Sequence, residues 1–207
     1  MVSNAPRCAR RGSSLARFGL AVAAVMLASL PLSAAAELHP NDHQGWVIGL
    51  GVGGGSAETK VGSNSSDRKG GASGNFRVGY CFDPAFMLGL ESTGLTRKEN
   101  GVTTSMSLVG AALTWYAPGT GFYARAGAGA SSLDASSSQD VGSATLTTSA
   151  SQSGWGALAG IGYELRMTRR FAIGPAVDFA YGDVGDDITF NQVSGLLQAN
   201  WYFLPKQ

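Results

Sequence analysis

The sequence has few of the residues that build disulfides, catalytic centres or membrane helices. Only two of its 207 residues are cysteine and two are histidine. Cys8 lies in an N-terminal segment that we expect to be removed, so Cys81 would be left alone and no intramolecular disulfide could form. Beyond residue 36 no run of about 18 apolar residues occurs, which excludes a helical membrane span. If the chain enters a membrane, it does so as strands.

Residues 1–36 have the composition of a Sec-type signal peptide. A basic stretch without acidic residues precedes an apolar stretch at 18–32, and small residues at 34–36 suit cleavage before Glu37. Removing the four arginines of this segment from 15 basic residues leaves 11 against 14 acidic ones, a net charge of −3. This balance excludes a basic surface for nucleic acid or another polyanion as the main theme.

The rest of the chain alternates between apolar and polar residues. In the last strand, one face would carry Val193, Gly195, Leu197, Ala199, Trp201 and Phe203, and the other Ser194, Leu196, Gln198, Asn200 and Tyr202. Successive side chains of a strand point to opposite faces, so each such segment has a mostly apolar and a mostly polar side. The pattern predicts eight strands, at 44–56, 73–82, 85–95, 103–116, 122–130, 155–167, 171–181 and in the segment ending at 203.

Two of these strands are irregular. In the strand at 103–116, Met106 and Leu108 fall on the opposite face from Val109 and Leu113, which a β-bulge would reconcile. In the strand at 171–181, Pro175 is expected to interrupt the hydrogen-bonded ladder because proline has no N–H to donate.

The connections alternate between two kinds. Long or polar loops are predicted at 58–71, 97–101, 131–153 and 182–187, the third being Ser/Thr-rich and expected to be mobile. Tight turns are predicted at Asp83-Pro84, Pro118-Gly119 and Arg169-Arg170. Short turns on one side and longer loops on the other are typical of an antiparallel barrel that spans a membrane, and a soluble meander has no reason to sort its connections in this way. We therefore predict an all-β fold, an eight-stranded antiparallel up-and-down transmembrane β-barrel.

With its signal peptide, eight alternating strands and terminal Asn200-Trp-Tyr-Phe203, the chain resembles the small outer-membrane barrels of Gram-negative bacteria, the OmpA/OmpX-type superfamily. The resemblance covers the mature domain and divides the chain into a signal peptide (1–36), a leader (37–44), a barrel (45–203) and a tail (204–207). It implies that Trp201 and Phe203 form the signal for the barrel-assembly machinery. The four residues after Phe203, and Gln198 where the family usually has glycine, depart from that signal.

Six ionisable residues face the predicted interior, three of each sign, and we call them the lumen network: Arg77, Glu91, Arg125, Glu164, Arg166 and Asp178. The interior of an eight-stranded barrel is just wide enough for side chains. Buried charges have to be paired there, because a lone one is costly to desolvate. We expect a salt-bridged network that fixes register and blocks conduction. The alternative is a catalytic or proton-relay pair, such as Glu164 with Arg166.

Other motifs have weaker functional interpretations. His39 and His43 precede the first strand, and we expect a solvated leader rather than a catalytic or metal site. The G-x-G-x-x-G pattern at 49–54 is not followed by a helix, so its glycines would thin the inner wall instead of binding a dinucleotide. Asp183, Asp186 and Asp187 would form a solvated acidic tip, with a divalent-cation site as the alternative. Cys81 should pack inside as a small apolar group.

These observations predict a non-enzymatic outer-membrane protein without cofactor or metal, whose barrel anchors external loops for surface interactions or envelope integrity. The alternative function is a narrow channel for small or apolar solutes. A soluble lipocalin-like barrel would need an apolar interior, which the inward-facing charges contradict. The expected partners are outer-membrane lipids and lipopolysaccharide, the barrel-assembly machinery and periplasmic chaperones. We expect a monomer that binds no nucleic acid.

Overall fold

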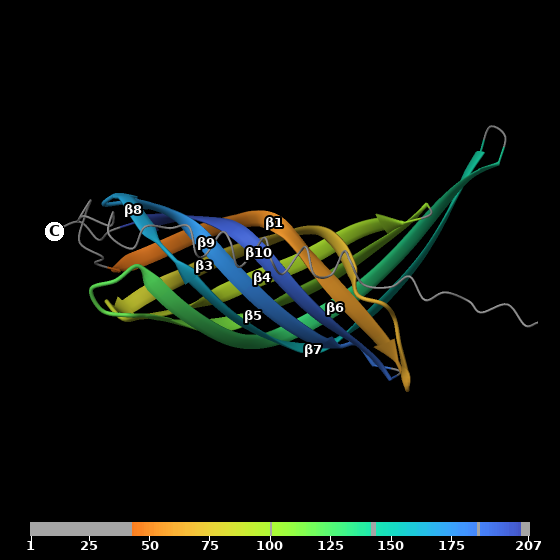
Figure 1. Ribbon diagram of the computed structural model, residues 1–207, viewed down its shortest axis with the longest axis horizontal. Helices are drawn as coiled ribbons and strands as arrows, with labels where there is room; N and C mark the ends of the chain where they lie inside the picture. Colours follow the sequence, from red (N-terminus) through yellow and green to blue (C-terminus); the bar gives the residue numbers. More distant parts are fainter. Residues whose placement is uncertain (1–42, 100, 142–143, 186, 204–207) are drawn as a thin grey trace, which may run out of the picture. The chain divides into compact units, whose positions relative to one another are not determined.

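The computed structural model describes residues 43–99, 101–141, 144–185 and 187–203, which form one antiparallel sheet (Figure 1). The predicted signal peptide and the tail lie outside the described residues. The strands are β1 (Gly45–Val61), β2 (Asn64–Ser65), β3 (Lys69–Asp83), β4 (Phe86–Glu99), β5 (Val102–Tyr116), β6 (Phe122–Val141), β7 (Ala144–Tyr163), β8 (Leu165–Thr168), β9 (Phe171–Asp183) and β10 (Ile188–Phe203). Among the described residues, no helix has the length and apolar character needed to cross a bilayer.

The sheet closes on itself, because β10 pairs with both β9 and β1. The seam between β1 and β10 is long, with Trp46 opposite Phe203 at one end and Val61 opposite Ile188 at the other. The two-residue β2 pairs only with the end of β1, and β7 and β8 both pair with β9 as two halves of one barrel strand. The predicted eight-stranded antiparallel barrel is confirmed.

Pro175 explains why the barrel strand is split into β7 and β8. The pairing with β9 runs to Gly162 opposite Ala176 and resumes in the same register at Leu165 opposite Ile173. The interruption therefore lies opposite Pro175, which cannot donate to the ladder, as the sequence predicts. The backbone N–H of Glu164 donates instead to the carbonyl of Gly121, at 2.7 Å.

Side chains alternate across the barrel wall as the sequence predicts. Large apolar residues on the outer face are strongly exposed, for example Trp46 at 57%, Leu88 at 56% and Leu90 at 65%. Their neighbours in sequence, Val47 and Met87, are fully buried in the interior. An apolar exterior of this extent is stable only when it is removed from water, which is the condition that a bilayer provides.

The bulge predicted for the strand at 103–116 is absent, and that expectation is wrong. β5 pairs without a register shift along both β4 and β6. Met106 and Leu108 are buried in the interior, each at 1% exposure, while Val109 and Leu113 face outward. Alternation is strict here, but the interior is apolar at this level, so apolar residues occur on both faces of the strand.

Three of the four long or polar loops predicted between strands are also wrong, because most of their described residues belong to strands. The segment predicted as a mobile loop at 131–153 lies in β6 and β7, which pair from Phe122 opposite Tyr163 to Val141 opposite Ala144. This hairpin extends beyond the other strands in Figure 1, where it is drawn in teal. The predicted loops at 58–71 and 97–101 are likewise largely strand, whereas the one at 182–187 is a loop as predicted, because β9 ends at Asp183 and β10 begins at Ile188. Outside a bilayer both faces of a two-stranded hairpin can be polar. Such strands lack the alternation of apolar and polar residues by which a strand is recognised in the sequence.

The two ends of the barrel therefore differ. At one end lie the short connections between β3 and β4, β5 and β6, and β8 and β9, and we call it the short-turn end. The other end carries the extended hairpins, and we call it the hairpin end. The short connections contain the predicted turns Asp83-Pro84, Pro118-Gly119 and Arg169-Arg170. In the second of them Gly119 has a φ of 69°, in the left-handed region that favours glycine.

Candidate functional site

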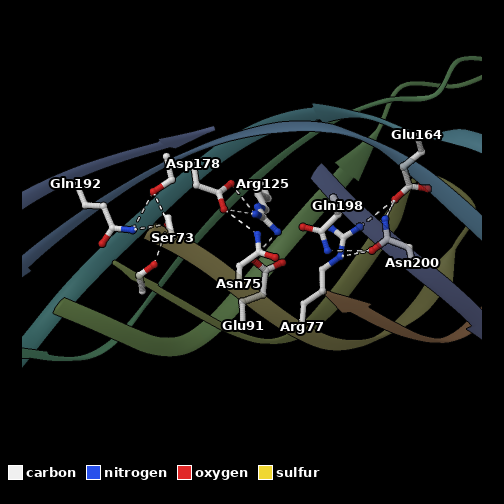
Figure 2. A network of polar contacts seen from close by, with 12 residues as sticks. Ser73, Asn75, Arg77, Glu91, Arg125, Glu164, Asp178, Gln192, Gln198 and Asn200 are labelled. Atoms are coloured by element: carbon white, nitrogen blue, oxygen red, sulfur yellow. Dashed lines mark hydrogen bonds and ion pairs between the residues drawn. The ribbon is translucent and has the colours of Figure 1, made fainter. Parts of the chain in front are cut away.

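All six residues of the lumen network lie inside the barrel, and none is more than 5% exposed. They come from β3, β4, β6, β8, β9 and the junction at Glu164 between β7 and β8. Figure 2 shows five of them in two groups along the interior: Arg125 with Glu91 and Asp178, and Glu164 with Arg77. The two groups have different geometry and partners.

Arg125 of β6 pairs with two carboxylates, Glu91 of β4 and Asp178 of β9, whose strands lie on either side of β6 in the sheet. Its Nη1 lies 3.0 Å from Glu91 Oε2, and its Nη2 lies 2.5 and 2.6 Å from the two oxygens of Asp178. Asn75 adds a hydrogen bond from Nδ2 to Asp178 Oδ2, at 2.8 Å. One guanidinium thus connects β4, β6 and β9 across the interior, and charge-assisted hydrogen bonds of this kind are stronger than neutral ones.

Glu164 is the centre of the second group. Its Oε1 accepts hydrogen bonds from Arg77 Nη2 at 2.9 Å and from Asn200 Nδ2 at 2.7 Å. Its Oε2 accepts one from the Tyr202 hydroxyl at 2.5 Å. Arg77 also donates from Nε to Asn200 Oδ1, at 3.1 Å. The carboxylate of Glu164 is therefore bound by side chains of β3 and β10, which are distant in sequence from the junction between β7 and β8 where Glu164 lies.

Arg166, which the sequence places beside Glu164 as a relay alternative, has a different surrounding. Its guanidinium lies over the ring of Tyr202, 3.7 Å from the centroid. Its Nη1 donates to the carbonyl of Arg169 in the turn before β9, at 3.1 Å. Stacking on an aromatic face stabilises a desolvated guanidinium. These contacts fix Arg166 at the short-turn end of the barrel.

The network extends through neutral polar side chains that the sequence analysis did not single out. Towards the hairpin end, the Ser73 hydroxyl donates to Ser194 Oγ at 2.7 Å, and Gln192 Nε2 donates to the same oxygen at 3.0 Å. Together with Asn75 and Asn200, these residues satisfy polar atoms that would otherwise be buried without partners. Their inward position follows from the same alternation that identified the charged residues.

His43 overturns the expectation of a solvated leader. It is 1% exposed, and its ring stacks on Tyr116 with centroids 3.7 Å apart and an interplanar angle of 16°. Its Nε2 lies 3.5 Å from Glu164 Oε2, and Tyr202 flanks it at 5.6 Å. His39 lies outside the described residues. The alternation of β1 extends to this residue, since His43 is in phase with the inward-facing Gly45 and Val47, but the sequence analysis ended the strand at residue 44 and did not use that signal.

Apolar layers bound the polar interior on both sides. Towards the hairpin end, a cluster of Ala57, Leu95, Met106, Val184 and Phe190 is buried. At the short-turn end, Val47, Cys81, Met87, Tyr116, Tyr123 and Tyr202 belong to another buried cluster. Cys81 packs inside, as predicted. The interior thus changes from apolar to ionic to apolar along the barrel, and side chains occupy it at each level.

Glycines on the inner face make room for the charged side chains. A Cβ at Gly49 would lie 2.3 Å from Asn200 Oδ1 and 2.8 Å from Arg77 Cγ, and one at Gly160 would lie 2.5 Å from Asp178 Oδ1. These distances are too short for non-bonded contact. The G-x-G-x-x-G pattern lies within β1 and opens no helix; Gly49 and Gly51 line the inner wall, and Gly54 is exposed.

Gly49→Val is therefore expected to displace Arg77 and Asn200 and to destabilise the folded barrel by about 1–3 kcal/mol, the usual cost of overpacking an interior. The matched control is Gly54→Val on the same strand, where a Cβ would meet only the Gly71 carbonyl, at 3.7 Å. Urea unfolding followed by tryptophan fluorescence measures both variants. Equal unfolding midpoints for the two would contradict the steric explanation.

Ion pairs also brace the hairpin end. Lys69 at the start of β3 pairs with Glu99 at the end of β4. Glu58 accepts a hydrogen bond from the Ser65 hydroxyl, which holds the pKa of its carboxyl below the usual value. Asp183 and Asp187 line a recess with Lys60, and Asp186 lies outside the described residues. Among the described residues, no three potential ligands are grouped to hold a metal ion.

A closed eight-stranded barrel with an apolar exterior and a charged, filled interior defines the class of outer-membrane β-barrel proteins. The profile of the outer membrane protein beta-barrel domain matches residues 20–201, and the chain belongs to this family. No curated protein matches the sequence.

Two solved structures share this fold at low sequence identity. Ail, the attachment invasion locus protein of Yersinia pestis, is 16% identical with a TM-score of 0.57, covering 77% of this chain and 100% of Ail. Neisserial surface protein A is 16% identical with a TM-score of 0.52, covering 77% of this chain and 98% of its own. At this identity the likeness establishes the fold, and the function has to be argued from the chain itself.

Proposed function

We propose that the protein is a non-enzymatic outer-membrane anchor whose closed barrel holds rigid hairpins outside the cell for surface interactions. The observation that carries this proposal is the filled interior, in which Arg125 and Glu164 are the centres of two ionic groups. In outer-membrane barrels the short turns face the periplasm and the longer connections face outward. The hairpin end is then the external one.

The extended hairpins are fixed relative to one another because apolar side chains are buried between them. Leu133 of β6 and Ile188 of β10 pack against the buried cluster of Leu95, Met106 and Phe190. The ion pair of Lys69 with Glu99 joins β3 and β4 at the same end. A surface fixed in this way loses less conformational entropy when a partner binds, which suits a role in recognition.

An enzymatic role has no support in the geometry of the one described histidine. Histidine-dependent hydrolysis requires the ring to be within hydrogen-bond reach of a nucleophile and of substrate. His43 is 1% exposed, one face of its ring is stacked on Tyr116, and Tyr202 lies at its side. A substrate could reach it only if His43 left the interior.

Lipids and lipopolysaccharide are the proposed surroundings of the apolar belt, and the barrel-assembly machinery and periplasmic chaperones are the proposed partners during export. Trp201 and Phe203, the proposed assembly signal, are 40% and 54% exposed at the end of β10. Trp201 contacts Phe171 with centroids 5.2 Å apart, and Phe203 lies opposite Trp46. The aromatic rim at this end suits the bilayer interface.

The alternative function is a narrow channel, and planar-bilayer recording separates it from the anchor. We expect the purified protein to give no stable openings, because the paired side chains of the interior exclude a continuous water path. A preparation whose folded state is verified by heat-modifiable gel migration serves as the starting point. Reproducible unitary conductance from that preparation would refute the anchor proposal and establish the channel.

A further inference from the structure

We propose that His43 is a latch that holds the segment leading into β1 within the short-turn end and thereby closes that end of the barrel. The proposal concerns residues 43–45 and the side chains they touch. It is independent of the proposed surface function, because a closed end can belong to an anchor or to a gated channel.

His43 continues the inner face of β1 beyond Gly45, the first residue of that strand. Gly45 and Val47 are buried on the inner face, and His43 is buried in the same alternation while Gln44 is exposed. Gly45 pairs with Cys81 of β3 and has a φ of 78°, a conformation that residues with a side chain adopt at a cost. The extension of the strand alternation thus places His43 in the interior at the short-turn end.

The contacts of His43 bring together strands that are distant in sequence. Tyr116 at the end of β5 stacks on one face of its ring, Tyr202 of β10 lies at the side, and Glu164 faces its Nε2. The hydroxyl of Tyr202 also donates to Glu164, so the histidine packs onto residues that are already fixed by hydrogen bonds. Aromatic stacking and burial together favour the docked position of His43 over a solvated one.

Cys81 provides a natural reporter of this closure. It is 4% exposed and belongs to the same buried cluster as Tyr116 and Tyr202. A recess of about 220 Å³ beside it is lined by Gln44, by Gly45 at the start of β1, and by residues 80–84 of β3 and the following turn. If the latch released, residues 43 and 44 would move away from this recess and the thiol would be exposed to water.

The test is the rate at which a small charged methanethiosulfonate reagent modifies Cys81 in the full chain carrying Cys8→Ser, folded in detergent. We expect slow modification in this parent protein and an increase of about tenfold in His43→Ala, because weaker docking raises the population in which residues 43–44 have left the barrel. Met167→Ala is the matched control, since Met167 of β8 is exposed on the outer face and does not line the recess at Cys81, and it should leave the rate unchanged. Heat-modifiable gel migration confirms that each variant is folded.

Two results would overturn the latch: rapid modification of Cys81 in the folded parent protein, or equal rates in the parent and in folded His43→Ala. If His43→Ala does not fold, His43→Leu replaces it, because leucine fills much of the same volume without a ring to stack or a nitrogen to face Glu164. The same increase is expected, and a folded His43→Leu protein with a fully protected Cys81 would equally refute the proposal.

Discussion

Arg125→Ala is expected to lower the free energy of unfolding by about 3–5 kcal/mol, the largest effect of any substitution considered for this chain. The guanidinium lies 3.0 Å from Glu91 and 2.5 Å from Asp178, and all three side chains are buried. Its removal leaves two carboxylates in the interior without their counter-charge. In urea the unfolding midpoint should fall by about 1 M or more.

The companion experiment separates lost charge from lost packing. In Arg125→Met with Glu91→Gln and Asp178→Asn, the interior keeps its volume but contains no unpaired charge. This triple variant should recover most of the stability, because replacing a whole buried ion pair by neutral groups is often nearly neutral. An unchanged midpoint in Arg125→Ala would show that the lumen network does not stabilise the barrel.

Leu88→Arg should cost about 2–4 kcal/mol if this position meets the middle of the bilayer, because a charged side chain is transferred into hydrocarbon. Leu88 is 56% exposed on the outer face of β4, between Phe86 at the short-turn end and Leu90. Equilibrium unfolding of the protein in lipid vesicles measures the loss. The direction of this effect depends on the apolar face pointing outward.

Thr96→Arg is the control for that prediction. Thr96 lies on the same face of the same strand near the hairpin end, where its hydroxyl is 3.1 Å from that of Ser105 in an exposed position. Arginine there should be tolerated within about 0.5 kcal/mol, as at other surface positions. Equal cost at both positions would mean that the bilayer does not cover the outer face of β4 at Leu88.

The barrel could be predicted from the sequence because its wall separates two environments. Between lipid and a filled interior, every second residue has to be apolar, and that demand makes positions such as Leu88 and Glu91 recognisable. The same demand placed the six charged residues inside. Beyond the surface of the bilayer the outward-facing residues no longer have to be apolar. The sequences of the strands at the hairpin end, such as the part of β6 beyond Ser131, therefore resemble those of loops.

The partners of the charged residues and of His43 could not be predicted in this way. Alternation gives the face of a residue and leaves open which residues of other strands lie at the same height. Glu164 and Arg166 are neighbours on one face in sequence, yet Glu164 bonds to Arg77 and Asn200 of distant strands. His43 is in phase with the inward-facing Gly45 and Val47, but alternation alone does not identify Tyr116 and Tyr202 as its neighbours.

The pairing of β1 with β10 has a consequence for biosynthesis. The last strand to be synthesised, β10, closes the barrel by pairing with the first strand, β1. The cylinder therefore cannot close until almost all of the chain has been synthesised. Hydrocarbon cannot solvate the two unpaired edges of an open sheet, so we expect insertion into a bilayer to follow synthesis of β10, and a polypeptide that ends before β10 to be unable to insert.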